Sequence, residues 1–404
     1  MSARSQLPPE KRMRILIAWE LGGNYGHILS LLPIARHLQA RGHTLVVVAA
    51  DLSVAGPLLQ AAGVALAQAP LPSRSTAQRE IASYADILAA HGFADYAALS
   101  ELTGCWQHIY SRFQPDAVLV NHAPGALVAA RLARIPTAAF GTGFEAPPPC
   151  SPYPPFRPWL NLPRSALLET EARILTNLRR QWITHQLVPP ALLCDAMQAD
   201  AQLLLTFPEM DHYPERGNAS YIGPVLSDVD GLDTAWCSAG RTKVFVYLHR
   251  SDQLESILNR LRQTDAQFIC VIPGIDPGLV DKYQGDNVQV FGAPVKLAPL
   301  LAGCKLAITH CGHGTVSTFL LAGTALLLIP TQVEQMMLSL RIRRAGIGLV
   351  LSLNDVKAHF DEALERMLDG AGFTLRAQEF AARHADYNCM KTVERITGAI
   401  ENLK

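Results

Sequence analysis

The stretch "ITHCGHGTVSTFLLAG" (308–323) joins the end of an apolar run to the start of a helix-like pattern. The run "KLAIT" (305–309) has the composition of a buried parallel strand, and "TVSTFLLAG" (315–323) has helical spacing with a glycine at its end. Between them, Gly312 and Gly314 predict a tight strand-to-helix turn whose backbone can approach a ligand closely. Such a turn points N–H groups and the positive end of a helix dipole outward, which suits a phosphate.

Three side chains of this turn add to the predicted phosphate site. His310 and His313 supply hydrogen-bond donors, and Thr315 supplies a hydroxyl. Two alternatives stay open from these residues alone. One is a strand-to-helix joint without any ligand. The other is a zinc site of His310, Cys311 and His313, although no fourth ligand stands at the usual spacing.

The next apolar run, "ALLLIP" (325–330), is followed by "TQVEQ" (331–335). Glu334 and Gln335 should therefore emerge at the same carboxyl edge of the sheet as the glycine turn. Sugar hydroxyls pair well with carboxylates and amides, so these residues beside a phosphate site indicate a nucleotide sugar. Taken singly, Glu334 and Gln335 would be solvated residues at a helix start.

The same alternation of short apolar runs and helical patterns occurs in both halves of the chain. The runs are "RILIAW" (14–19), "TLVVVAA" (44–50), "AVLV" (117–120) and "TAAF" (137–140), then "KVFVYL" (243–248), "QFICVI" (267–272), "VQVF" (288–291), "KLAIT" and "ALLLIP". Alternating strands and helices predict α/β domains with doubly wound parallel sheets. We expect two Rossmann-like domains, 1–222 and 241–388, with a linker at 223–240 and a final helix at 389–404.

Composition narrows the class of partner. A chain of 404 residues can form two domains with cores of their own, and a net charge of zero argues against a nucleic-acid partner. The first residues contain an apolar run too short for a signal peptide or a transmembrane span, and the cysteines form no CxxC pair. We therefore expect a cytoplasmic protein with reduced thiols and a small-molecule partner.

The most irregular stretch is "EAPPPCSPYPPFRPWLNLP" (145–163), whose prolines oppose a helix. Its aromatic residues Tyr153, Phe156 and Trp159 predict a loop that lines an apolar binding site. A purely structural crossing loop is an equally good interpretation of the same residues.

Segment 291–335 resembles the donor-binding signature of the UDP-glycosyltransferase superfamily, whose GT-B enzymes glycosylate small lipophilic molecules. The similarity includes the spacing of four elements: "AP" at 293–294, "HCG" at 310–312, the proline at 330 and "EQ" at 334–335. The stretch "GGNYGHILSLLPIARHLQARGHTLVVVAAD" (22–51) is similar to the first acceptor-site loop and helix of the same family. The resemblance implies a GT-B fold, in which two domains face each other across a cleft and the last helix packs back on the N-terminal domain.

The resemblance also implies roles for individual residues. His27 falls on the general base of an inverting direct displacement, with Asn121 at the position that orients it. The donor positions are Arg250, Ala293, Val295, His310, Gly312, His313, Gly314, Thr315, Thr318, Glu334 and Gln335, and the acceptor positions are Gly26 and the three aromatic residues of 145–163. The implied co-substrate is a UDP- or dTDP-sugar, without a permanent cofactor or a metal, and the implied acceptor is small and lipophilic.

Several positions depart from the family pattern. Gly292 replaces the usual tryptophan that stacks on the base, and Thr318 replaces the ribose-binding glutamate. His249 and Arg250 stand where small residues usually let a phosphate approach, and Asn121 replaces an aspartate. Two hypotheses therefore remain: an active hexosyltransferase with altered nucleotide recognition, and a non-catalytic GT-B relative that binds a nucleotide, a small molecule or a protein. A dinucleotide-dependent oxidoreductase fits less well, because "GGNYG" lacks the G-x-G-x-x-G spacing.

Overall fold

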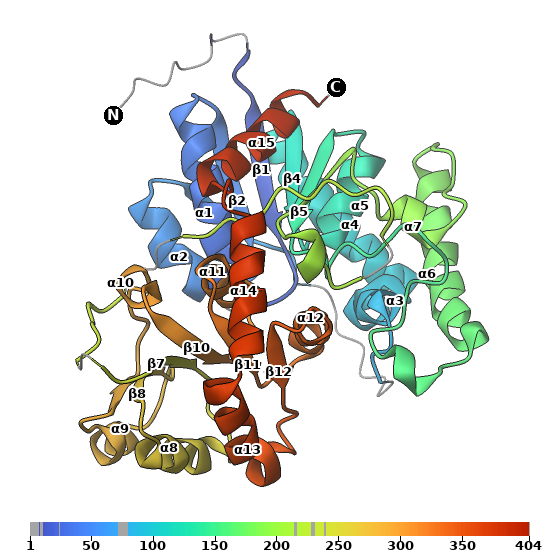
Figure 1. Cartoon of the computed structure of the whole chain (residues 1–404). Helices are drawn as coiled ribbons and strands as arrows, with labels where there is room; N and C mark the ends of the chain where they lie inside the picture. The colour runs from blue at the N-terminus through green and yellow to red at the C-terminus, as the bar shows by residue number, and fades with distance from the viewer. Residues whose placement is uncertain are drawn as a thin grey trace. The chain divides into compact units, whose positions relative to one another are not determined.

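The computed structural model describes residue 8 and residues 11–23, 25–71, 80–213, 216–227, 231–237 and 240–403. The chain forms two compact units (Figure 1). The first unit extends to Val225 and includes the C-terminal segment from Cys389, and the second unit is Leu226–Asn388. Parts of the predicted linker, 228–230 and 238–239, lie outside the described residues.

A six-stranded parallel sheet forms the centre of the first unit, in the order β3-β2-β1-β4-β5-β6. Its strands are β1 (Arg14–Trp19), β2 (Thr44–Ala49), β3 (Ala65–Gln68), β4 (Ala117–Asn121), β5 (Thr137–Gly141) and β6 (Ala201–Leu204). Its helices are α1 (Tyr25–Ala40), α2 (Leu52–Ala61), α3 (Tyr84–Leu88), α4 (Tyr96–Phe113), α5 (Pro124–Leu132), α6 (Arg164–Thr184) and α7 (Leu193–Ala196). Nearly every residue of β1 and β4 is buried, as the continuous apolar runs predict for central strands covered on both faces.

A second six-stranded parallel sheet forms the centre of the other unit, in the order β12-β11-β10-β7-β8-β9. Its strands are β7 (Lys243–Tyr247), β8 (Gln267–Val271), β9 (Val288–Phe291), β10 (Cys304–Thr309), β11 (Ala325–Leu328) and β12 (Gly348–Val350). Its helices are α8 (Leu254–Gln263), α9 (Pro277–Tyr283), α10 (Ala298–Leu301), α11 (His313–Leu321), α12 (Val333–Arg344), α13 (Val356–Asp369) and α14 (Ala371–Arg383). The predicted α/β class with two doubly wound parallel sheets is confirmed.

The two sheets have one topology. In each unit the first strand is central, the next two strands extend to one side, and the last three extend to the other side. Strand β7 thus corresponds to β1, strand β10 to β4, and helix α11 to α5. Each unit has its topological switch point beside its first strand, between β1 and β4 and between β7 and β10.

The C-terminal helix α15 (Cys389–Glu401) is part of the first unit and lies along α1 (Figure 1). Its buried face, Val393, Ile396 and Ile400, packs into the core that β1 and α1 also form. Glu401 accepts hydrogen bonds from Arg41 Nε at 2.5 Å and pairs with His43 Nε2 at 2.9 Å. This anchors the end of the chain to the loop after α1.

The segment that precedes β7 packs on the second unit. Leu232 donates its N–H to the Pro294 carbonyl at 2.9 Å and accepts from Lys296 N–H at 3.0 Å, so it pairs with the loop after β9. Trp236 Nε1 donates to the Leu300 carbonyl at 3.2 Å. The described residues of this segment therefore cover the edge of the second sheet near β9.

Candidate active site

The carboxyl ends of β1 and β4 lie side by side at the centre of the first sheet. Their register places Trp19 opposite Asn121, the last residue of each strand. Helix α1 begins at Tyr25, so His27 lies in its first turn, next to these strand ends. Open α/β sheets bind ligands at such a switch point. The structure therefore brings the two predicted catalytic residues together.

A chain of hydrogen bonds fixes the tautomer of His27. Asn121 Nδ2 donates to the Phe140 carbonyl at 3.0 Å, and Asn121 Oδ1 lies 2.7 Å from His27 Nδ1. A carbonyl only accepts, so the NH₂ of the amide must face Phe140 and its oxygen must face the imidazole. His27 Nδ1 therefore carries the hydrogen, and a neutral ring keeps its lone pair on Nε2.

The surroundings keep this imidazole neutral. Burial lowers the pKa of His27, and the hydrogen bond with Asn121 offsets only part of that effect. Trp19 stacks on the ring, with centroids 5.4 Å apart and planes 25° apart. Trp19 is itself held because its Nε1 donates to the Leu21 carbonyl at 2.9 Å. A neutral imidazole with a lone pair on a defined nitrogen has the form that a general base requires.

Gly22, which the sequence interpretation did not single out, faces Nε2 of His27. Its φ of +86° lies in the left-handed region, and a Cβ on this residue would lie 2.5 Å from Nε2. The loop after β1 thus presents bare backbone to the basic nitrogen. Gly26, predicted at the acceptor site, is exposed in the first turn of α1, and its carbonyl accepts from Ser30 Oγ at 3.2 Å.

Glu20 is a buried carboxyl group that the sequence interpretation also missed. Its oxygens accept from Gly125 N–H at 3.2 Å, from Ala126 N–H at 3.0 Å and from Trp106 Nε1 at 3.0 Å. Gly125 and Ala126 are in the first turn of α5, after Pro124, so Glu20 caps this helix from the adjacent strand. Burial raises the pKa of Glu20 to about 7, against these hydrogen bonds.

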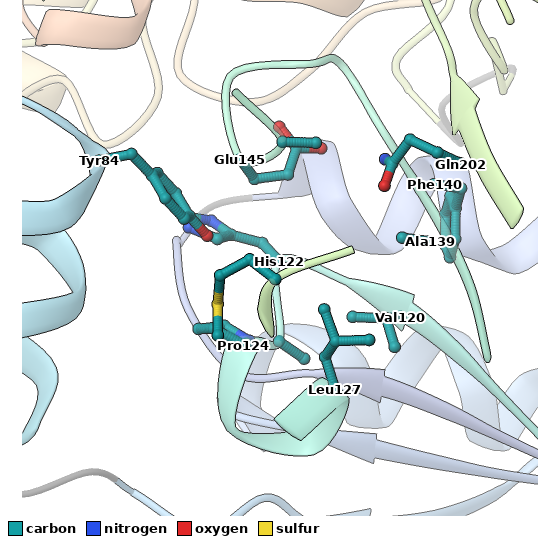
Figure 2. Close-up of a pocket in the computed structure, with 12 residues that line it drawn as sticks. Tyr84, Val120, His122, Pro124, Leu127, Ala139, Phe140, Glu145 and Gln202 are labelled. Atoms are coloured by element: carbon teal, nitrogen blue, oxygen red, sulfur yellow. The ribbon is translucent and has the colours of Figure 1, made fainter. Parts of the chain in front are cut away.

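A small cavity of about 30 Å³ lies next to His122 (Figure 2). Val120, Leu127 and Phe140 form part of its apolar wall, and Tyr84, His122, Glu145 and Gln202 bring polar atoms. This volume has room for roughly one or two water molecules. The cavity therefore admits only a small part of a ligand in this conformation.

His122 lines this cavity and also lies near His27. Its ring centroid lies 6.0 Å from that of His27 and 6.0 Å from that of Tyr84. Its φ of +44° is in the left-handed region, and its Nε2 is buried without a hydrogen-bond partner among the described residues. Burial, and then the nearby His27 and His91, hold the pKa of His122 well below its usual range.

The aromatic residues predicted at the acceptor site occupy different surroundings. Tyr153 is buried and meets Tyr84 edge-on at 6.1 Å, so it supports a residue of the cavity wall. Phe156 is buried and stacks on Phe144 at 5.1 Å. Trp159 is 48% exposed. Their contact with an acceptor stays a prediction.

In the second unit, the predicted phosphate turn lies between β10 and α11. The strand ends at Thr309 and the helix begins at His313, with Gly312 as its N-cap residue. Gly312 has no side chain to cap the first turn, and that turn contains no acidic residue. Gly314 is exposed and Thr315 is half-buried. An N-terminus of this kind presents backbone N–H groups and a positive dipole to an anion.

A cluster of aromatic rings lies beside this turn. His310 Nδ1 lies 3.3 Å from the Tyr247 carbonyl, which can only accept, so Nδ1 carries the hydrogen. His310 Nε2 lies 3.1 Å from the position of a Cβ on Gly312. The ring of His249 lies 4.0 Å from that of His310, and the ring of Tyr247 lies 4.7 Å from it. Burial, and then His249, lower the pKa of His310 to about 4.

The predicted sugar-binding pair lies at the start of α12. Gln335 is buried, and its Oε1 accepts from Thr331 N–H at 2.9 Å and from Thr331 Oγ1 at 3.0 Å. The amide oxygen is therefore engaged within the helix start, and only the NH₂ group can serve a sugar. Glu334 is half-buried and contributes, after burial, to a raised pKa of Cys311 in the phosphate turn. Its carboxylate therefore lies close to that turn.

The positions predicted for the nucleoside lie around the loop after β9. Gly292 and Ala293 are exposed, and Val295 is buried and paired with Leu232. Any contact between Val295 and a donor would therefore involve its backbone. Phe291, the last residue of β9, is half-buried.

At two other predicted donor positions, Thr318 and Arg250, the side chain makes a hydrogen bond within the chain. Thr318 Oγ1 donates to the Gly314 carbonyl at 2.9 Å, inside α11. Arg250 is exposed, and its Nη1 donates to the Gly274 carbonyl at 3.3 Å, in the loop after β8. The guanidinium is thus held at the carboxyl edge of the second sheet.

Neither a metal site nor a membrane span is found where the structure can be described. Among the described residues, no group of three or more His, Cys, Asp or Glu side chains could hold a metal ion, and this includes the alternative site of His310, Cys311 and His313. No described helix is both long and apolar enough to cross a bilayer.

Comparison with known proteins shows the fold. No protein family model matches the chain, and no curated protein matches it. Among solved structures, the calicheamicin glycosyltransferase CalG4 is similar with a TM-score of 0.74 and 17% identity, over 97% of this chain and 99% of that chain. The spinosyn rhamnosyltransferase SpnG with spinosyn aglycone is similar with a TM-score of 0.70 and 18% identity, over 94% and 98%. The glycosyltransferase VinC with dTDP gives a TM-score of 0.67 and 16% identity, over 96% and 100%.

These similarities extend over nearly the whole of each chain, so they concern both units and not one Rossmann-like domain alone. The two doubly wound sheets and their shared topology are the features that these structures have in common with the chain. The chain therefore has the GT-B fold that these natural-product glycosyltransferases have.

Proposed function

We propose that the chain is an inverting glycosyltransferase, which moves a sugar from a nucleoside-diphosphate sugar to a hydroxyl group of a small lipophilic acceptor. The observation that carries this proposal is the bonding of His27. Asn121 and the Phe140 carbonyl hold the ring with hydrogen on Nδ1, so the lone pair is on Nε2 beside Gly22. If His27 had only a structural role, nothing would require a residue without a side chain, Gly22, beside its Nε2.

In the proposed reaction, the acceptor oxygen attacks the anomeric carbon as the bond from that carbon to the diphosphate oxygen breaks. The proton of the hydroxyl passes to His27 Nε2. The diphosphate leaves with its charge stabilised by the N-terminus of α11 and the side chains around it. The proposal uses no metal and no permanent cofactor.

The donor and acceptor classes follow from similar proteins. VinC was crystallised with dTDP and SpnG with thymidine diphosphate, so dTDP-sugars come first among the proposed donors and UDP-sugars second. SpnG was also crystallised with spinosyn aglycone, which supports a lipophilic acceptor. We propose a cytoplasmic site of action.

The second candidate is a non-catalytic GT-B protein that binds a nucleotide, a small molecule or a protein. Asn121 favours it, because an amide cannot stabilise an imidazolium by charge. The engaged oxygen of Gln335 favours it too, because it reduces the groups available to a sugar.

The test has two stages. First, purified protein is screened by thermal shift against UDP, dTDP and their glucose and rhamnose derivatives, since a ligand of the folded state raises the midpoint. Second, the sugar that binds is offered with a panel of lipophilic alcohols and phenols, and products are measured by mass spectrometry. We expect His27→Gln to lose roughly 10²–10⁴-fold in kcat and to keep donor binding.

His359→Gln is the matched control, because His359 is an exposed histidine on α13. Full turnover by His27→Gln would exclude His27 as the base. Donor binding without transfer to any acceptor, by the native chain, would support the non-catalytic candidate instead.

A further inference from the structure

The loop after β7 carries a histidine to which the proposed reaction has assigned no role. His249 is half-buried, and its ring lies 4.0 Å from that of His310, with the planes tilted by 35°. No hydrogen bond or ion pair engages His249 within the described part of the chain. A half-buried imidazole without such a partner, in ring contact with a buried residue at the phosphate turn, is placed to meet a ligand.

The position of His310 defines what that ligand would be. Its Nε2 lies next to Gly312, the N-cap of α11, so this ring lies beside the helix N-terminus and the ring of His249 lies next to it. His310 Nδ1 donates to the Tyr247 carbonyl, which leaves a lone pair on Nε2 while the ring is neutral. A lone pair directed at an anion is unfavourable, so an anion here needs a protonated partner nearby.

We infer that His249 binds the diphosphate of the nucleotide sugar, and that its imidazole takes up a proton from solvent when the diphosphate binds. The inference rests on the donor role proposed above for the second unit. It adds a proton-linked contact from a residue outside the predicted donor set.

Burial and charge in the free chain support this assignment. Burial lowers the pKa of His249, and the pKa of His310 falls to about 4 through burial and then His249. The other titratable or charged residues within three positions of either histidine are Tyr247, Arg250, Asp252, Cys311 and His313, and Glu334 acts on Cys311. The lowered pKa of His249 has burial as its cause, and that of His310 has burial and His249. The pair is therefore uncharged at neutral pH until an anion arrives.

The sign of the pH dependence follows. A bound diphosphate favours the charged imidazole, so the pKa of His249 is higher in the complex than in the free chain. Between these two pKa values the complex holds more protons than the free chain, and affinity falls as pH rises. During transfer, the imidazolium lies beside the leaving diphosphate and stabilises the negative charge that develops there.

The test is isothermal titration calorimetry with UDP-glucose and dTDP-glucose at pH 6 and pH 8, in buffers of different ionisation enthalpy. A nucleotide sugar is the suitable probe, because its diphosphate is esterified at both ends and lacks the terminal phosphate pKa of about 6. We expect Kd of the native chain to rise roughly three- to tenfold from pH 6 to pH 8, with net proton uptake on binding.

His249→Gln should bind with a Kd that does not depend on pH and that matches the native value at pH 8. His359→Gln should behave as the native chain does. His249→Asn, a smaller uncharged replacement, repeats the test if the glutamine variant is unstable. Binding without proton uptake, or the native pH dependence of Kd in both His249 variants, would overturn the inference about His249 and leave the donor role intact. Failure of every nucleotide sugar to bind at either pH would overturn the donor role as well.

Discussion

At the switch points of the two sheets, the N-termini of the corresponding helices α5 and α11 differ in how they are capped. In the first unit, Glu20 follows β1 and caps α5 through Gly125 and Ala126. In the second unit, Leu248 stands directly after β7 and His249 follows it, and the corresponding helix α11 begins at a glycine N-cap without a side-chain cap. The same topology therefore supplies a carboxyl cap from the chain itself in one unit and leaves the helix terminus uncapped by a side chain in the other.

This difference separates the two chemical tasks. In the first unit the chain's own Glu20 caps the helix terminus, and the proposed base His27 has an apolar environment that keeps the ring neutral. A terminus that no carboxylate caps, next to side chains that can become cationic, suits a leaving group with negative charge. The residues that follow β1 and β7 thus differ between the proposed proton-accepting site of the first unit and the proposed anion site of the second unit.

The largest effect that we expect from this comparison concerns Glu20. Its pKa is about 7 in the folded chain against an ordinary value of 4.5, so between these values the folded state holds a proton that the unfolded state has lost. Stability should therefore fall as pH rises from 4.5 to 7, by on the order of 3 kcal/mol at most, and stay lower above pH 7. Glu20→Gln should lose this pH dependence.

The measurement is the thermal midpoint of both proteins from pH 5 to pH 8. The difference between the thermal midpoint of Glu20→Gln and that of the native chain should become more positive as pH rises, because only the native chain loses stability. Glu101→Gln, which changes an exposed glutamate on α4, is the control. Parallel pH curves for the native chain and Glu20→Gln would show that Glu20 stays charged in the folded state, and that the cap is an ordinary ionised one.

The next effect concerns access to the base. Gly22→Ala would place a methyl group 2.5 Å from His27 Nε2 and would also strain a backbone at φ +86°. We expect roughly a ten- to hundredfold loss of kcat, because a small displacement of the base is costly for proton transfer. Gly23→Ala is the matched control, since its Cβ would meet nothing within 4 Å. Equal activity of the two variants would show that Nε2 is not the reacting nitrogen.

Asn121→Asp tests the oriented tautomer more finely. An aspartate would stabilise the imidazolium and raise the pKa of His27, so the acid limb of the kcat/KM profile should move to higher pH, by about one unit. It would also place a carboxylate oxygen against the Phe140 carbonyl, where Asn121 Nδ2 now donates at 3.0 Å. We therefore expect the free energy of unfolding to fall by roughly 1–3 kcal/mol, which a lower thermal midpoint would report. An acid limb that moves to lower pH would contradict the proposed bonding.

The central strands were predictable from sequence, whereas among the described edge strands only β9 was. The runs that predicted β1, β4, β8 and β10 are buried almost throughout, so their apolar composition is a direct consequence of their position. Strands β3, β6 and β12 have three or four residues each and lie at sheet edges. An edge strand has only one neighbouring strand and less cover, so its sequence need not be strongly apolar.

Only part of the candidate site could be predicted from the sequence, for a different reason. The strand-to-helix turn at 310–314 was predictable because it follows a strand in one local stretch, whereas His27 was singled out through the resemblance of 22–51, and the roles of both stay predictions. Glu20 caps residues more than 100 positions away, and no local pattern records that contact. A glutamate directly after an apolar strand was the available signal. The engagement of Gln335 Oε1 by Thr331 is local, yet a helix-start glutamine and a sugar ligand have the same sequence appearance.

The smallest effect that we expect concerns the second switch point, where two glycines of the phosphate turn can be compared. A Cβ on Gly312 would lie 3.1 Å from His310 Nε2, whereas a Cβ on Gly314 would meet nothing within 4 Å. Gly312→Ala should therefore displace the imidazole and raise Kd for the nucleotide sugar by roughly three- to tenfold, about the free energy of one hydrogen bond. Gly314→Ala should leave Kd near its native value unless the diphosphate itself contacts this exposed position. The two titrations distinguish a turn that supports His310 from one that touches the ligand directly: weaker binding by Gly314→Ala alone would place the anion over the backbone of the helix and away from the histidine pair.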